Sequence, residues 1–303
     1  YDLGVVAWAT SRDYVEKRMA LHETAKVHHH RGYKVKLLAL SGYEIFRDTG
    51  VEEVGYEVID CAPYFDALAQ KYVNLRKVFK RDNRGNFFYN NTLRWMVIKE
   101  FLSGNRVNVD GDLIVNRGAM AHLASRKCKF FYPDSTCFVV TNEPFFESYF
   151  EIVDFIEKSP TEAFAYIQDY AIKNRISHWG LNSLNSVEDL DEERIAAFAV
   201  HRAGLYESAT SGSPELACPP FIAHAYGAAP LGRYLAPLSA RFPDGVSYEY
   251  REDTHYFSGF PLCFMHYQEQ LHFLLGCHGI LSRLGAHDHL YRELLPKSQL
   301  IEY

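Results

Sequence analysis

The sequence predicts an α/β protein in which a mostly parallel sheet is flanked by helices and the C-terminal half is elaborated. Two observations support this class. Through the first third of the chain, short apolar runs alternate with amphipathic helical segments. The runs are apolar at nearly every position, as in strands buried on both faces. With 303 residues the chain is long enough for one large domain, and no repeat, low-complexity block or linker divides it.

Taken in order, the segments of the first third justify that class. The pattern favours a strand where apolar residues run continuously and a helix where they recur every three or four positions, as Leu93, Val97 and Ile98 do. The expected elements are a strand at 3–9, a helix at 12–30, strands at 34–40 and 56–61, helices at 65–80 and 91–102, and a strand ending at Asp110.

The second half is less regular. A buried strand is expected first, and Pro144 suits the first turn of the helix that follows it. The expected elements are a strand at 137–141, helices at 144–157, 161–175 and 189–200, a loop at 208–220, a strand at 261–267 and a helix at 268–284.

Composition limits the class of partner. The net charge is −6 and Lys and Arg form no long cluster, so a nucleic-acid partner is not expected. No apolar run has the length of a membrane span, and the six cysteines are dispersed without a CxxC pair. These features predict a cytoplasmic protein, soluble or attached peripherally to a membrane. The chain begins at Tyr1 rather than Met, which allows for an upstream segment.

The segment Asp110-Gly111-Asp112 is the most informative motif. It joins two apolar runs, so two carboxylates stand at the end of a buried strand. Buried or half-buried carboxylates require a positive partner, and a divalent metal carrying a phosphate-rich ligand would serve. A plain acidic turn is the alternative, because Asp-Gly is a common hairpin dipeptide. Ligands of parallel sheets bind beyond the carboxyl ends of the strands, where Thr10-Ser11 and Ala62-Pro63-Tyr64 should converge with this motif.

Residues 90–116, NNTLRWMVIKEFLSGNRVNVDGDLIVN, resemble the metal-site region of glycosyltransferases with the GT-A fold, in which a helix bearing an Arg and an aromatic precedes a strand ending in Asp-x-Asp. Residues 137–142 resemble the strand beneath the donor sugar. Residues 264–268 resemble the late strand whose His completes the metal site. Together with the opening strand and residues 10–13, the ordered set covers most of the chain.

This resemblance implies a GT-A-like, Rossmann-type single domain over residues 1–303. Residues 1–116 would bind the nucleotide sugar, and residues 117–303 would bind the acceptor and supply the C-terminal helices. The implied activity is metal-dependent transfer of a hexosyl or pentosyl unit from a UDP- or GDP-linked donor to a saccharide or glycoconjugate, as in polysaccharide biosynthesis. The implied cofactor is Mn²⁺ or Mg²⁺, because a hard divalent cation stabilises the departing diphosphate.

The resemblance assigns the metal to Asp110, Asp112 and His266. Asp110 would reach the ribose and the metal, and Asp112 would bind the metal directly. Gly111 would let the donor approach the backbone. His266 would add a nitrogen ligand, although a hydrogen-bonded core histidine fits its apolar strand equally well.

Four residues are candidates for holding the nucleotide. Ala9 and Thr10 end the first strand. Tyr64 could stack on the base or simply close the sheet edge. Arg94, on the helix before the motif, could reach a phosphate or an Asp carboxylate, and a surface salt bridge is its alternative.

No single residue stands out as the catalytic base. His178 occupies the position where the resemblance implies a carboxylate or amide, and Glu143 and Asp169 are the other candidates. The leaving phosphate could also take the proton. The adjacent Trp179 could support a sugar ring or belong to the core.

Other classes remain open at this stage. A sugar nucleotidyltransferase shares such a sheet, but residues 10–18 lack its glycine-rich basic loop. A non-catalytic carbohydrate-binding protein could retain the fold. GxGxxG, GxxxxGK[ST] and GxSxG are absent. His28, His29 and His30 are expected to end a helix, where cationic groups complement its dipole. The cluster Cys277-His278 with His287-Asp288-His289 matches no zinc signature.

Overall fold

The computed structural model describes residues 1–15, 21–79, 86–111, 113–115, 117–125, 127–132 and 136–206, with strand residues 223–224, 248–251, 254–257, 260–261 and 264–266. Its centre is a five-stranded sheet in the order β3-β2-β1-β4-β6. The first four strands are parallel and β6 is antiparallel to β4, so the predicted α/β class with a mostly parallel sheet is confirmed. The strands are β1 (Asp2–Trp8), β2 (Val35–Ser41), β3 (Tyr56–Asp60), β4 (Arg106–Val109) and β6 (Phe138–Thr141).

Each face of this sheet has its own apolar core. Along β1, Val5 and Ala7 belong to one cluster, whereas Val6 and Trp8 pack against the other. This alternation follows from the two-residue period of a strand. Because both faces of the sheet are covered, the side chains that point to either face are apolar. This explains the continuous apolar runs in the sequence.

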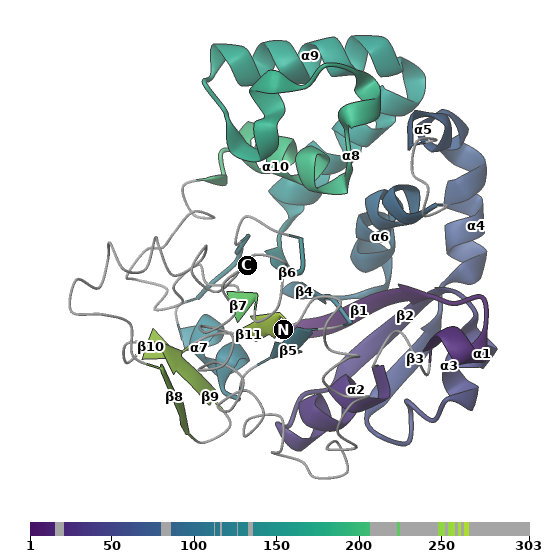
Figure 1. The fold of residues 1–303 in the computed structure, drawn as a ribbon, viewed down its shortest axis with the longest axis vertical. Helices are drawn as coiled ribbons and strands as arrows, with labels where there is room; N and C mark the ends of the chain where they lie inside the picture. Colours follow the sequence, from purple (N-terminus) through teal and green to yellow (C-terminus); the bar gives the residue numbers. More distant parts are fainter. Residues whose placement is uncertain are drawn as a thin grey trace, which may run out of the picture.

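Helices cover the two faces unequally. The larger core lies under α4, α5, α6, α8, α9 and α10, and the smaller core lies under α2, α3 and α7. Figure 1 shows α8, α9 and α10 gathered in a helical layer beyond the β4–β6 edge of the sheet. The helices are α1 (Arg12–Tyr14), α2 (Leu21–His30), α3 (Tyr43–Asp48), α4 (Ala62–Lys71), α5 (Val73–Val78), α6 (Phe87–Phe101), α7 (Ala119–Ser125), α8 (Glu143–Lys158), α9 (Pro160–Lys173), η3 (His178–Ser183), η4 (Val187–Asp189) and α10 (Glu192–Arg202).

One predicted helix is divided in the structure. The helix expected at 65–80 ends with α4 and restarts as α5, on either side of Tyr72. Glu157 explains the restart, because its carboxylate accepts hydrogen bonds from the backbone N–H groups of Asn74 and Leu75 at 3.1 and 2.8 Å. The Tyr72 hydroxyl donates to Asp154, which lies on α8 together with Glu157, at 2.7 Å. A tertiary contact with α8 therefore breaks a pattern that is helical in the sequence.

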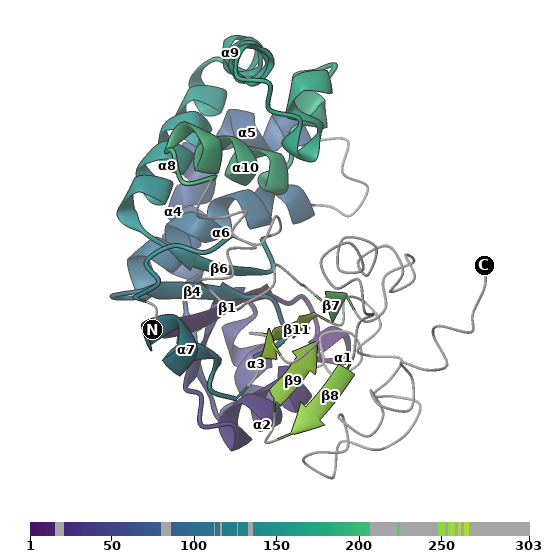
Figure 2. The ribbon, with the colours of Figure 1, turned by 90° about the vertical axis from the view of Figure 1, so that its left-hand side faces the viewer.

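Two small sheets lie beside the main one, and Figure 2 shows them on one side of the molecule. The apolar run after the acidic motif forms β5 (Leu113–Val115), which leaves the main sheet and pairs antiparallel with β11 (Phe264–His266). The strand expected at 261–267 is thus partly β11 and partly β10 (Phe260–Pro261). The remaining strands are β7 (Ala223–His224), β8 (Tyr248–Arg251) and β9 (Thr254–Phe257).

Some expectations fall beyond this description. The loop at 208–220 and the helix at 268–284 lie outside the described residues, as does the Cys277 to His289 cluster. Within the described residues, none of the helices combines the length and apolar character needed to cross a bilayer. Cys61, Cys128 and Cys137 are buried.

Candidate functional site

The sheet topology identifies the region where a ligand would bind. The chain winds outward from β1 through β2 to β3 and then returns to place β4 on the other side of β1. The winding direction therefore reverses between β1 and β4. In open α/β sheets, ligands bind beyond the carboxyl ends of the strands that flank such a reversal. Here those ends are Ala9-Thr10 and Asp110.

Asp110 is held in a tight turn directly after β4. Its backbone N–H donates to the carbonyl of Cys137 at 2.8 Å, and its own carbonyl accepts from the N–H of Leu113 at 3.1 Å. The side chain is 29% exposed, so the carboxylate can meet a ligand while the backbone is fixed. Asp112, the second acid of the motif, lies outside the described residues.

Arg94 orients the Asp110 carboxylate. The guanidinium, buried on α6, donates through Nη1 to Oδ1 of Asp110 at 2.9 Å and through Nη2 to the Thr136 carbonyl at 3.2 Å. Among its expected uses, the contact with an Asp carboxylate is the one present here. Burial alone would lower the pKa of Arg94, but Glu192 and Asp110 raise it above its ordinary value, so the group stays charged.

Glu192, to which the sequence pattern assigns no role, is a buried ion-pair partner of Arg94. It is the first residue of α10, and its carboxylate accepts from Arg94 Nη2 at 3.3 Å and from the indole N–H of Trp95. Its other oxygen accepts from the Thr136 hydroxyl at 3.0 Å. A buried acid with every oxygen bonded is a structural anchor. It fixes α10 to α6 and, through Arg94, to Asp110.

Glu193 is a half-buried acid beside this anchor. Burial raises its pKa to about 8, and the negative charges of Glu192, Asp191 and Asp110 act in the same direction. A carboxyl that titrates near neutral pH can accept or donate a proton in catalysis. In the sequence, Asp191-Glu192-Glu193 is typical of any helix start, where acids complement the dipole, so nothing distinguished these residues.

The opposite side of the motif is clamped by α2. Buried His28 accepts the Val115 N–H through Nε2 at 3.0 Å, and Arg31 donates to the Val115 carbonyl at 3.0 Å. Nδ1 of His28 lies 3.0 Å from the Tyr56 hydroxyl. Because Nε2 accepts, the ring is neutral with the proton on Nδ1, and burial lowers the His28 pKa to about 3. His28 thus positions β5 rather than merely ending a helix.

The backbone register brings the strand that carries His266 next to the strand that follows the acidic turn. In the β5–β11 pair, His266 is opposite Leu113, the residue that follows Asp112. Two motif residues, Gly111 and Asp112, separate Asp110 from that pair in the sequence. Two segments about 150 positions apart in the chain therefore meet beside the acidic turn. The described residues contain no cluster of three metal-binding side chains, but Asp112 and the His266 side chain are outside that search.

The donor set fits a hard divalent cation. One oxygen of Asp110 is engaged by Arg94, and the other accepts no hydrogen bond within the described residues. A partly exposed carboxylate, with Asp112 two positions later and His266 on the strand that pairs with β5, suits Mn²⁺ or Mg²⁺. A soft-metal site would instead present thiolates, whereas Cys137, whose carbonyl accepts the Asp110 N–H, is buried in the smaller core.

Two of the residues expected to bind the nucleotide, Ala9 and Thr10, differ in their exposure. Ala9 is buried and its N–H donates to the Ser41 carbonyl at 3.3 Å, whereas Thr10 is exposed. The β1–β4 pairing ends at Gly4 and Asn108, so β1 continues past the point where β4 turns away. Ala9 and Thr10 therefore share an edge with Asp110 but lie further along the strand direction.

Tyr64 and Gly111 serve packing in this structure. The Tyr64 ring, on α4, lies edge-to-face on Phe101 of α6, with 5.7 Å between ring centroids. A Cβ at position 111 would come within 2.9 Å of the Leu21 side chain. The glycine therefore permits the close approach of α2 to the acidic turn. Close approach is the property expected of Gly111, and α2 is the neighbour that uses it.

The three candidate bases lie apart. Glu143 follows β6 and pairs with Lys99 and Arg106, each at 2.9 Å, at the amino end of β4. It is therefore at the edge opposite Asp110. Asp169 is exposed on α9 and pairs with Lys173 at 2.6 Å.

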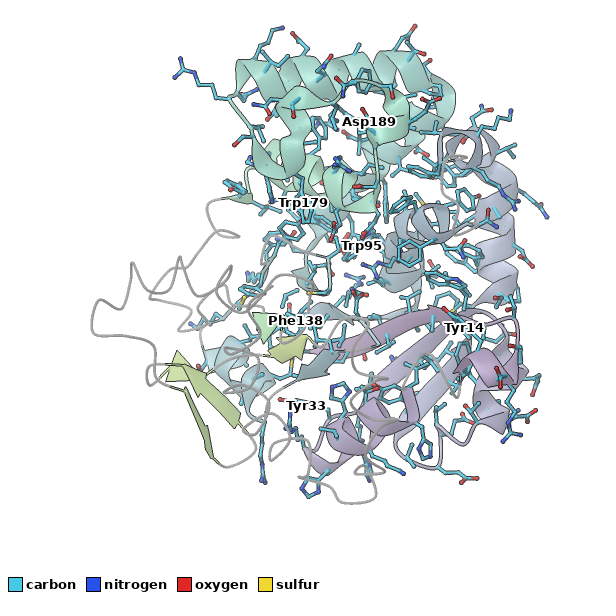
Figure 3. All side chains as sticks on the ribbon, viewed as in Figure 1. Tyr14, Tyr33, Trp95, Phe138, Trp179 and Asp189 are labelled. Atoms are coloured by element: carbon cyan, nitrogen blue, oxygen red, sulfur yellow. The ribbon has the colours of Figure 1, made fainter. Side chains whose placement is uncertain are left out.

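His178 lies in η3 against aromatic rings of Tyr132, His201 and Tyr206. Burial, helped by His201, lowers its pKa to about 4, so it is neutral at pH 7. Trp179, beside it, is 39% exposed and thus not a core tryptophan. Figure 3 shows Trp179 at the margin of the helical layer that faces the sheet.

Comparison with models of known protein families gives no match, and none of the curated proteins searched matches the chain. The geometry of the site is therefore the basis for assigning a function.

Proposed function

We propose that this protein is a metal-dependent glycosyltransferase with a GT-A-like fold, which moves a sugar from a UDP- or GDP-linked donor to a saccharide or glycoconjugate. The observation that carries the proposal is the position of Asp110. It follows β4 at the reversal of the sheet, is oriented by buried Arg94, and stands in the turn where β11 returns His266 opposite Leu113.

The metal would be held by Asp110, Asp112 and His266. When bound, it would act as a Lewis acid that stabilises negative charge on the departing diphosphate. Arg94 keeps the Asp110 carboxylate in one orientation, and the His28–Arg31 clamp on Val115 keeps the turn from shifting. Preorganised ligands of this kind lose little freedom when the donor binds.

Glu193 is the base that we assign. In the transfer, the acceptor hydroxyl oxygen bonds to the anomeric carbon as the bond from that carbon to the diphosphate breaks. The electron pair leaves on the diphosphate, and the hydroxyl proton passes to Glu193. Burial and the neighbouring acids raise the pKa of Glu193, and the charge of the cation would lower it, so the loaded site would favour the carboxylate form.

A thermal-shift screen of nucleotide sugars with and without manganese tests the donor assignment. The donor and manganese together should raise the melting temperature, whereas the Asp112→Asn variant should lose this stabilisation and the transfer activity while still unfolding cooperatively. Asp66→Asn, an exposed acid on α4, is the matched control. Transfer activity that persists in Asp112→Asn would contradict the assignment of Asp112 as a metal ligand.

Two further variants divide the roles. His266→Ala should require more manganese for half-maximal activity. A manganese titration that matches that of the wild type would indicate that His266 has only a structural role. Glu193→Gln should lower kcat about 100-fold or more with little change in the donor KM, as expected for loss of a general base. Glu162→Gln, an exposed acid on α9, is its control. Full activity of Glu193→Gln would indicate that the departing diphosphate, and not Glu193, accepts the proton of the acceptor hydroxyl.

A further inference from the structure

Trp179 combines two features that rarely occur together. Its side chain is 39% exposed, and its backbone has φ 50° and ψ 24°, in the left-handed region. Gly180, which follows, has φ 68°. Glycine adopts this conformation without strain, whereas a bulky residue does not. The chain therefore places a large aromatic side chain where its backbone cost is high and its burial is incomplete. Such an outlier is a reason to examine the residue for a function.

The contacts of the backbone fix where the indole stands. The Trp179 carbonyl accepts from Nε of Arg194 at 3.2 Å, and Arg194 also forms an ion pair with Asp191. The Gly180 N–H donates to the Ser177 carbonyl at 2.9 Å. Leu181 is fully buried beneath the turn. The exposed ring is thus presented by an anchored loop, which lowers the entropy lost when a ligand stacks on it.

The same contacts tie Trp179 to the first turn of α10. Arg194 is adjacent in sequence to Glu193, so one hydrogen bond, from Arg194 to the Trp179 carbonyl, joins the loop carrying the indole to the turn carrying the acid. Trp95, by contrast, is fully buried and bonded to Glu192, and supplies the core role that a tryptophan usually has. An aromatic face on this loop and a carboxylate on the adjoining turn of α10 supply the two kinds of contact that a pyranose needs, for its apolar C–H face and its hydroxyl edges.

We propose that Trp179 forms the acceptor subsite, where the apolar face of a pyranose ring stacks on the indole and a ring hydroxyl is directed toward Glu193. This inference rests on the proposed glycosyltransferase function for its meaning, but carbohydrate binding at Trp179 can be measured independently of transfer. The acceptor class is accordingly a saccharide that offers a flat C–H face.

Saturation-transfer NMR with methyl β-D-galactopyranoside, methyl β-D-glucopyranoside and methyl α-D-mannopyranoside tests the subsite. For at least one glycoside, protons of one ring face should gain saturation from the wild-type protein. Trp179→Gly should reduce the signal roughly fivefold or more, as the loss of one stacking contact implies. Because glycine suits the left-handed backbone, this variant should fold. Trp179→Phe, which keeps an aromatic face, should retain part of the signal.

Ile172→Ala is the control, since Ile172 on α9 is 56% exposed and has no part in the subsite. No saturation of any of the three glycosides by the wild type would overturn the proposal, as would equal saturation by the wild type and Trp179→Gly. Manganese-dependent donor hydrolysis separates the two proposals. Hydrolysis retained in Trp179→Gly together with lost transfer supports the acceptor role. Wild type that binds glycosides through Trp179 but hydrolyses no donor would contradict the proposed function alone.

Discussion

Removing the Glu192 carboxylate should destabilise the protein strongly, because it breaks a buried ion pair. Arg94 and Glu192 have side chains that are 7% and 5% exposed. In Glu192→Ala, the guanidinium loses one of its two acids, and the Trp95 indole N–H and Thr136 hydroxyl each lose an acceptor. Loss of one member of a buried pair costs about 3–5 kcal/mol. Asp110 still neutralises Arg94 in part, so we expect about 3 kcal/mol, at the lower end.

Urea denaturation measures this loss. With a slope of about 3 kcal/mol/M, a loss of about 3 kcal/mol lowers the midpoint by about 1 M. Glu192→Gln keeps the shape and can still accept from Trp95, so its loss should be about 1–3 kcal/mol. Glu162→Ala, at an exposed site on α9, should change the midpoint very little. A loss of less than about 1 kcal/mol in Glu192→Ala, with the slope unchanged, would refute the anchoring role.

Three other predictions concern ionisation and backbone conformation. Burial lowers the His28 pKa to about 3, so the unfolded chain binds the extra proton first, and stability should fall as the pH drops from about 6.5 toward 3; His28→Leu should remove that part of the pH dependence. Burial and neighbouring acids raise the Glu193 pKa to about 8. As the pH rises from 4.5 to 8, the free energy of unfolding of the wild type should therefore fall relative to that of Glu193→Gln, by up to about 1.4 kcal/mol per pH unit. A difference between the two proteins that does not change with pH would contradict this prediction. Arg175 follows the cap of α9 with φ 54° in a Schellman arrangement, so Arg175→Gly should raise the free energy of unfolding by about 0.5–1 kcal/mol, and no rise in melting temperature would contradict the strain argument.

Local sequence pattern was a good guide to the elements of the sheet. The strands expected at 3–9, 34–40 and 56–61 are β1, β2 and β3 within one residue at either end. Buried parallel strands are continuously apolar, and this signal needs no knowledge of distant residues. The division of the helix at 65–80 was missed because Glu157, about 80 positions later, supplies the cap.

The site was predictable only in part. A carboxylate at the end of a buried strand is visible in the sequence, which predicts a role for Asp110, and the structure shows that Arg94, on the preceding helix, contacts this carboxylate. Glu192 and Glu193 were missed because acids at a helix start are ordinary in sequence. Their burial against Arg94 and Trp95 follows from the packing of α10 on α6.

The sequence by itself determined the class of fold, the strand that ends at Asp110 and the acidic chemistry at its tip, because each depends on residues close together in the chain. Only the tertiary structure decided which charges face Asp110, that His28 and Arg31 clamp Val115, and that β11 lies beside β5. The physical reason is that ion pairing and desolvation act through space. A carboxyl group acquires its pKa and its partners from neighbours that the folded chain brings to it.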